Sequence, residues 1–118
     1  MALHTDTGKL GESLAVQWLE SKGYTIIKRN WRFFRFEIDI IASLGECIHF
    51  VEVKTRTSRV FGFPENQVDR KKLRQLLAAG SEYLFQKGTW NKVRYDILSV
   101  NIIGDQSEFL FIEDVYVW

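Results

Sequence analysis

Side chains able to hold a metal ion or transfer a proton concentrate in residues 37–54 of this sequence. Two short runs with β-strand character, residues 36–42 and 47–55, are separated by the connector 43–46, which contains Gly45. A short Gly-containing connector between two such runs predicts a β-hairpin. The hairpin then decides which of the charged side chains share a face of the sheet.

The predicted hairpin separates polar from aliphatic side chains. Closing it with Ala42 opposite Cys47 puts odd positions of the first strand on the same face as even positions of the second. One face then carries Glu37, Asp39, Phe50, Glu52 and Lys54, and the other carries Ile38, Ile40, Val51 and Val53. We expect the aliphatic face to lie in the core.

Asp39 and Glu52 come out as diagonal neighbours on the polar face, about 7–8 Å apart. At an effective dielectric constant of about 20, two carboxylates at this separation repel each other by about 2 kcal/mol. Lys54 would offset part of the repulsion, and a divalent cation between the carboxylates would turn it into ligation by hard oxygen donors. The ordinary alternative is a solvated face with cross-strand ion pairs.

A wider set of short motifs resembles a known family. The motifs are Gly8-x-x-Gly11-Glu12-x-x-Ala15, Arg29-Asn30-Trp31-Arg32, Glu37-Ile-Asp-Ile-Ile-Ala42, Phe50-Val-Glu-Val-Lys-Thr-Arg56, Phe61-Gly62-x-Pro64-Glu65 and Ala78-Ala79-x-x-x-Tyr83-Leu84. Together they resemble the YraN-like family of small bacterial endonuclease-like proteins, which is similar to archaeal Holliday junction resolvases. Asp39 followed by Glu52-Val53-Lys54 also resembles the signature of the PD-(D/E)XK nuclease superfamily.

The resemblance covers nearly the whole chain and implies both a fold and a chemistry. It implies a restriction-endonuclease-like core with a mixed sheet, and metal-dependent hydrolysis of phosphodiester bonds in DNA, including branched or structured DNA. Mg²⁺ or Mn²⁺ would be held by Asp39, Glu52, the Val53 carbonyl and Glu12, and Lys54 would complete the catalytic set. A four-way junction would require a symmetric homodimer. Phe36 departs from the family pattern, which usually has Gly there.

Length and composition indicate one folded domain, residues 1–118. Of the residues, 46% are apolar and 14% aromatic, which fits a globular α/β protein. The net charge is only +1, so binding to nucleic acid would need a local basic patch. Cys47 is the single cysteine, which excludes an internal disulfide and a cysteine-based zinc site. With no signal peptide and no long apolar stretch, we expect a soluble, cytoplasmic protein and no membrane partner.

Hydrophobic periodicity predicts a sheet of about five strands flanked by two main helices. The helices are expected at residues 7–22 and 69–87, and the strands at 24–31, 36–42, 47–55, 93–102 and 108–117. The last two strands are apolar enough to be buried on both faces. Glu12 would lie in the first or second helical turn, where the helix dipole is an alternative reason for an acid. Asp96 is expected to be structural and His49 to be packed.

Basic residues that could contact phosphates fall in three segments. They are Arg32 and Arg35 among aromatic residues before the hairpin, Arg56 and Arg59 directly after it, and Arg70, Lys71 and Lys72 at the start of the second helix. Cations beside aromatic rings suit phosphates and bases, and cations at a helix start oppose the helix dipole unless an anion compensates them. The alternative is a set of core aromatics with a solvated basic surface.

Three functions remain open from the sequence. They are a metal-dependent DNA endonuclease, a non-catalytic nucleic-acid-binding module that retains the nuclease fold, and an interaction protein whose hairpin charges are surface pairs. The presence of Asp39, Glu52 and Lys54 together favours the enzyme.

Overall fold

The computed structural model describes residues 2–57 and 70–115 of the chain. The elements are α1 (Ala2–Ser21), β1 (Thr25–Phe33), β2 (Phe36–Leu44), β3 (Cys47–Arg56), α2 (Arg70–Lys87), β4 (Lys92–Ile103) and β5 (Gln106–Ile112). The strands form a five-stranded sheet in the order β1-β2-β3-β4-β5. Because β3 and β4 are parallel and the other neighbours antiparallel, the sheet is mixed, and the predicted α/β architecture is confirmed.

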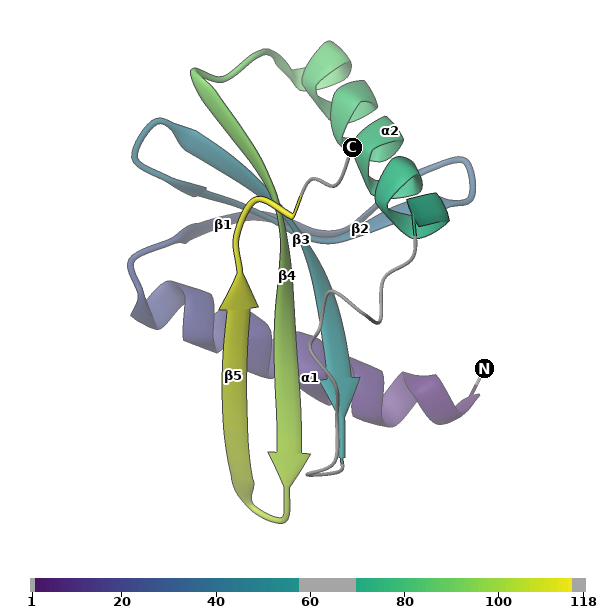
Figure 1. The fold of residues 1–118 in the computed structure, drawn as a ribbon, viewed down its shortest axis with the longest axis vertical. Coiled ribbons are helices and arrows are strands. Elements are labelled where there is room, and N and C mark those ends of the chain that lie inside the picture. Colours follow the sequence, from purple (N-terminus) through teal and green to yellow (C-terminus); the bar gives the residue numbers. More distant parts are fainter. Residues whose placement is uncertain (1, 58–69, 116–118) are drawn as a thin grey trace.

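The two helices cover opposite faces of the sheet (Figure 1). On one face α1 packs Ala15 and Leu19 against a cluster that includes Ile40 and Val51. On the other face α2 packs its buried residues against a cluster that includes Phe50, which is fully buried. Successive strand residues point to opposite faces, so both faces of the central strands are core. The expectation that the aliphatic residues lie in the core is confirmed, and Phe50 on the opposite face is buried as well.

The hairpin of β2 and β3 closes more tightly than predicted. Leu44 pairs with Cys47 around the turn Gly45-Glu46, in place of the predicted pair of Ala42 and Cys47. The shift is by an even number of positions, so Ile41 and Phe50 still share a face. Asp39 and Glu52 are the next residues on each strand beyond the last pair, Ile40–Val51, so the register places them at opposite positions instead of diagonal ones.

Regular alternation along β2 breaks at Asp39. Ile38 packs in the cluster under α2, whereas Ile40 packs in the cluster under α1, although residues two apart on a strand normally share a face. Asn30 lies across from Asp39 on β1, between the pairs Arg29–Ile40 and Trp31–Ile38, and has a φ of 53°. The expectation that Ile38 lies on the face of Ile40 is wrong because this left-handed residue interrupts the strand pair.

Two further boundaries differ from prediction. Helix α1 begins at Ala2, not at residue 7, so Glu12 lies in the middle of the helix and beyond the reach of the positive dipole end. Strand β5 ends at Ile112 and alternates between exposed and half-buried residues, because it is an edge strand; burial on both faces is confirmed for β4 only. The expected start of the second helix at Asp69 lies outside the described residues.

No helix in the described ranges is both long enough and apolar enough to span a membrane.

Gly80 provides a test of how α2 packs on the sheet. A Cβ added at Gly80 would lie 2.6 Å from the Tyr95 ring, whereas one added at Gly8 in α1 would meet nothing within 4 Å. We expect Gly80→Ala to lower the free energy of unfolding by about 1–3 kcal/mol through overpacking. Gly8→Ala should raise it by up to about 1 kcal/mol, as alanine usually does in a helix. Urea unfolding measures both changes, and stabilisation by both would contradict the close packing of α2.

Candidate active site

A cleft of about 760 Å³ opens between the two helices and strands β1, β2 and β3. Its lining contains all four predicted catalytic residues, Glu12, Asp39, Glu52 and Lys54. The fold thus brings together side chains from α1, β2 and β3 that the sequence placed in separate elements. It also adds neighbours that the sequence did not assign to this group.

Asp39 is positioned where the ladder between β2 and β3 ends. Beyond the pair Ile40–Val51, the Val53 N–H donates to Asp39 Oδ2 at 2.8 Å. Burial raises the pKa of Asp39 well above its usual range, the Glu52 carboxylate raises it further, and the Val53 hydrogen bond offsets part of the shift. A largely buried acid beside a second acid in a cleft is typical of a functional site.

Glu52 is held by two lysines. Lys72 Nζ donates to Glu52 Oε2 at 3.1 Å, and Lys54 Nζ lies 3.6 Å from the same oxygen. Burial lowers the pKa of Lys54, and Glu52 only partly opposes this. Burial is the largest single influence on the pKa of Lys72 and lowers it, but attraction and hydrogen bonding to Glu52, together with Lys54 and Asp39, raise the pKa overall. Lys72 was predicted as a nucleic-acid contact, and the structure shows that it is also part of the acid cluster.

Glu12 reaches the cleft because α1 lies directly on β3. A Cβ at Gly11 would overlap the Thr55 side chain, so only glycine allows this approach. Burial raises the pKa of Glu12, and the charge of Glu37 adds to the shift. Glu12 therefore shares the electrostatics of the cleft, as its predicted role requires.

Asn30 is a cleft residue to which sequence reasoning gave no role. It lines the cleft, and its side chain hydrogen-bonds to Glu12 and so lowers the pKa of that acid in part. Its positive φ is a conformation that asparagine tolerates better than most residues. An asparagine within a run of strand-forming residues was the available signal.

The predicted phosphate contacts before the hairpin lie at and beside the cleft. Arg32 lines the cleft and lies 3.6 Å from Glu37, its partner across the strands. Arg35 is exposed in the turn between β1 and β2, 5.5 Å from the centre of the Phe36 ring. Arg32 thus belongs to the cleft lining, whereas Arg35 contacts the Phe36 ring instead.

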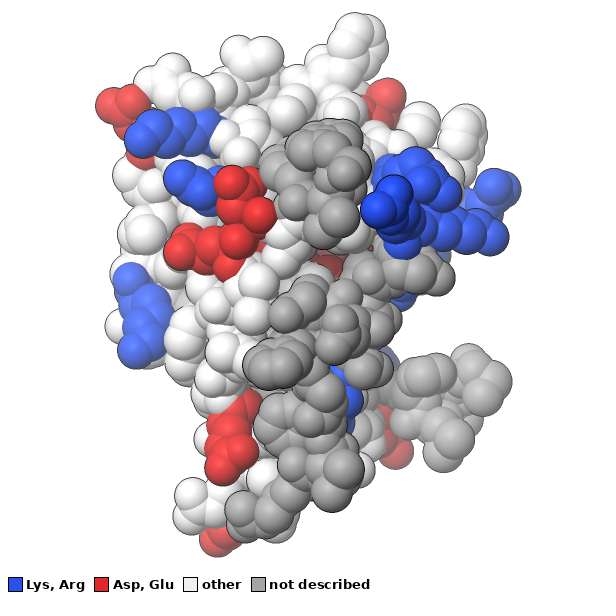
Figure 2. Space-filling model, viewed as in Figure 1, with Lys and Arg blue, Asp and Glu red and all other residues white. Residues whose placement is uncertain are grey.

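The remaining predicted contacts are divided among other positions. Arg70 and Lys71 are exposed at the start of α2, where Figure 2 shows a gathering of Lys and Arg side chains. Arg56 is half-buried at the end of β3, and Arg59 lies outside the described residues. The exposed basic residues among these predicted contacts therefore lie at the start of α2 and around the turn between β1 and β2.

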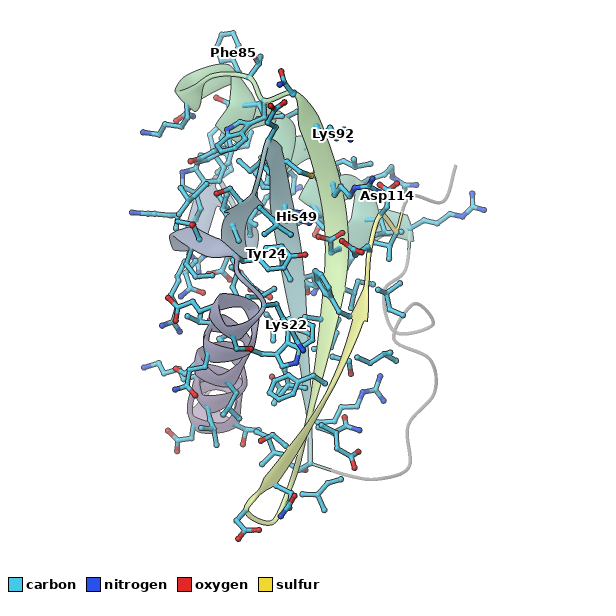
Figure 3. The ribbon with its side chains drawn as sticks, turned by 90° about the vertical axis from the view of Figure 1, so that its left-hand side faces the viewer. Lys22, Tyr24, His49, Phe85, Lys92 and Asp114 are labelled. Carbon is cyan, nitrogen blue, oxygen red and sulfur yellow. The ribbon has the colours of Figure 1, made fainter. Side chains whose placement is uncertain are left out.

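A second buried acid lies outside the cleft lining. His49 Nδ1 is 2.6 Å from Asp96 Oδ2, and Asp96 Oδ1 accepts the Asp114 N–H at 2.8 Å. The Tyr24 ring packs edge-on against His49 at 5.0 Å (Figure 3). The predictions that Asp96 is structural and His49 packed are confirmed, and their pairing joins β3, β4 and the segment after β5.

The described residues contain no group of three or more His, Cys, Asp and Glu side chains close enough to hold a metal ion unaided. The cleft offers instead the two neighbouring carboxylates of Asp39 and Glu52, with Glu12 on the α1 side. Any cation bound here would need further oxygen ligands from water, the backbone or a substrate.

Comparison with known proteins assigns the family. The model of "Uncharacterised protein family UPF0102" matches residues 11–100. The chain belongs to the UPF0102 family. It is 44% identical over 100 residues to the UPF0102 protein of Flavobacterium psychrophilum, covering 85% of this chain and 84% of that protein. It is 43% identical to the Bacteroides thetaiotaomicron UPF0102 protein, covering 92% and 88% of the two chains.

A UPF0102 protein of Alkaliphilus metalliredigens is 42% identical, covering 92% of this chain and 96% of the relative. The match to UPF0102 confirms the family resemblance seen in the motifs. The matched segment includes every predicted catalytic residue from Glu12 to Lys54. None of these UPF0102 names states an activity, so the function has to be argued from the cleft.

Asp39→Asn tests the cost of the buried charge. Because the pKa of Asp39 is raised in the folded protein, the native state binds more protons than the unfolded state, and stability falls as the pH rises above about 4. We expect Asp39→Asn, which keeps an oxygen for the Val53 N–H, to raise the free energy of unfolding at pH 7 by about 1–2 kcal/mol.

Asp39→Ala should gain less stability, because the Val53 N–H loses its acceptor. Chemical denaturation at several pH values from about 4 to 8 measures both variants against the native protein. A difference between native and Asn proteins that does not change with pH would contradict the raised pKa.

Proposed function

We propose that this protein is a metal-dependent endonuclease that hydrolyses phosphodiester bonds in DNA, with branched or structured DNA as its substrate. The observation that supports this most is the pair of neighbouring carboxylates, Asp39 and Glu52, in one cleft at the point where the pairing of β2 and β3 ends. Two acids that repel each other in a largely buried position destabilise the fold, which favours a role in chemistry. Action on a four-way junction would require a homodimer.

The residues of the cleft fit Mg²⁺ or Mn²⁺. Mg²⁺ is commonly bound by one or two carboxylates, with waters and substrate phosphates as its other ligands. Asp39 and Glu52 supply the carboxylates, and the negative charge that raises the pKa of Asp39 is what a divalent cation would neutralise. Glu12 and the Val53 carbonyl would complete the set, Glu12 through water.

The ion, when bound, would neutralise charge on the scissile phosphate and acidify a water molecule. The chain's own groups have separate tasks in the same cleft. Lys54 presents a cation where negative charge develops on the phosphate, and its lowered pKa also suits it to exchange a proton. Arg32 at the cleft would bind a neighbouring phosphate, and Lys72 would fix the orientation of Glu52.

A second candidate is the non-catalytic nucleic-acid-binding module. The two lysines on Glu52 favour it, because they neutralise one of the two carboxylates without any metal. In that case the basic residues would grip the DNA backbone and the acids would only shape the cleft. Cleavage and metal binding separate the two candidates.

Cleavage of a labelled DNA panel tests the proposed activity. The panel contains duplex, single strand, flap, splayed fork and four-way junction, each at low salt with Mn²⁺ or Mg²⁺. We expect cutting by the native protein and a loss of at least about 100-fold in Asp39→Ala, because a lost metal ligand removes several kcal/mol of transition-state stabilisation. Glu20→Ala, which removes an exposed acid from α1, is the matched control and should cut normally.

Equal cutting by the native and Asp39→Ala proteins would point to a contaminant. Binding of the panel without any cutting would support the binding module.

Titration of Mn²⁺ by calorimetry tests the metal site directly. We expect Glu52→Ala to weaken Mn²⁺ binding by at least about 10-fold, because the cation loses a carboxylate ligand. Lys72→Ala should strengthen it, because the competing ammonium 3.1 Å from Glu52 is gone. Glu20→Ala should bind as the native protein does, and equal affinity in all four proteins would favour the reading of the charges as ordinary ion pairs.

A further inference from the structure

The turn between β1 and β2 exposes an aromatic ring on a strained backbone. Phe34 is 85% exposed and has a φ of 58°. A bulky residue rarely adopts this left-handed conformation, and both its strain and its exposed ring oppose stability. Such features concentrate at functional sites.

The other aromatic residues of this segment have structural roles. Trp31 and Phe36 pack against the cluster under α2, as expected for core aromatics. Phe33 stacks on Phe34, with ring centres 4.6 Å apart and an angle of 28° between the ring planes. Phe33 thus supports Phe34 from one side, and most of the Phe34 ring stays open to solvent.

The turn that carries Phe34 directly joins two strand segments whose residues line the cleft. Arg32 and Glu37 pair across the strands one step before the turn-closing pair of Phe33 and Phe36, and both line the cleft. Asp39 is five residues from Phe34 along the chain. At about 3.3 Å per residue this is at most about 16 Å, or roughly five stacked bases at a rise of about 3.4 Å. A DNA strand in the cleft could therefore reach Phe34.

The surrounding charges indicate what the ring would contact. Arg35 follows Phe34 directly, and the Arg32 side chain is 65% exposed. An aromatic face flanked by cations suits a nucleobase between two phosphates. In an intact duplex the base faces are covered by their neighbours, so a ring at this position gains contact only where bases are unpaired.

We propose that Phe34 is a stacking platform for an unpaired nucleobase, so that the protein recognises DNA whose bases are unstacked close to the scissile phosphate. This inference rests on the proposed nuclease function, since it takes DNA as the occupant of the cleft. Its substrates are forks, flaps and open junctions, and an intact duplex is excluded.

Binding in metal-free buffer tests the platform without requiring cleavage. The probes are fluorescein-labelled single strand, splayed fork and blunt duplex, and fluorescence anisotropy gives the affinity. We expect Phe34→Ala to weaken binding of the first two by about 5- to 100-fold, the effect of losing one base–aromatic stack, and to change duplex binding by less than about 2-fold. Phe85→Ala is the matched control, because Phe85 is 86% exposed and projects from the far end of α2 (Figure 3).

Two further variants exclude a folding defect. Phe34→Trp keeps an aromatic face and should retain the preference for the fork. Phe34→Gly removes both the ring and the strain, so it should lose the preference without any fall in Tm. The fluorescence of a 2-aminopurine base placed at the fork should be quenched by the native protein and not by Phe34→Gly.

The outcomes separate this inference from the nuclease itself. Unchanged fork binding in Phe34→Ala, or an equal loss on fork and duplex, would overturn the platform, while cutting that depends on Asp39 would leave the nuclease standing. Failure of the native protein to bind any of the DNAs would overturn the platform, and failure to cut the labelled panel with Mn²⁺ or Mg²⁺ as well would overturn the nuclease.

Discussion

The separation of β2 from β3 after the pair Ile40–Val51 is the constraint on which the site depends. A strand that leaves its partner exposes a backbone N–H, and here Asp39 accepts the N–H of Val53 with its own carboxylate. The same hydrogen bond that completes the sheet thus fixes an acid beside Glu52. On the other side of β2, the left-handed Asn30 marks the same interruption in the pairing with β1.

The helices convert this interruption into a cleft with interdependent charges. Glycine at position 11 lets α1 rest on β3, which brings Glu12 close enough for burial to raise its pKa. From α2, Lys72 reaches Glu52 and limits the repulsion between the acids. The pKa values of Glu12, Asp39 and Lys54 therefore depend on how the two helices pack against the hairpin.

Much of this arrangement followed from the sequence, because hydrophobic alternation specifies which residues share a face. Alternation repeats every two residues, so it cannot detect a shift of the strand pairing by two positions. The sequence therefore predicted that Asp39 and Glu52 share a face, but it did not predict the pairing of Leu44 with Cys47. The reversal at Ile38 was also missed, because it depends on the backbone of Asn30 in another strand.

Capping signals proved weaker than helix propagation. Thr5, Asp6 and Thr7 are residues that can cap a helix, yet α1 continues through them from Ala2. Contacts that form when a helix packs on the sheet could not be predicted either. The ion pair of Lys72 with Glu52 is an example, because no short sequence pattern links the two residues. The metal ions, the DNA and the dimer remain predictions.

The distances along the chain between bonded groups also bear on how the site assembles. The bond from Val53 to Asp39 spans 14 residues, the bond from Lys72 to Glu52 spans 20, and that between His49 and Asp96 spans 47. Longer loops lose more chain entropy on closure, and non-local contacts slow folding. Of these three bonds, the one that fixes Asp39 closes the shortest loop, whereas the bond that anchors β4 and the bond of Lys72 to Glu52 close longer ones. Screening of the acids by salt or by divalent ions would then favour the hairpin during folding as well as in the finished protein.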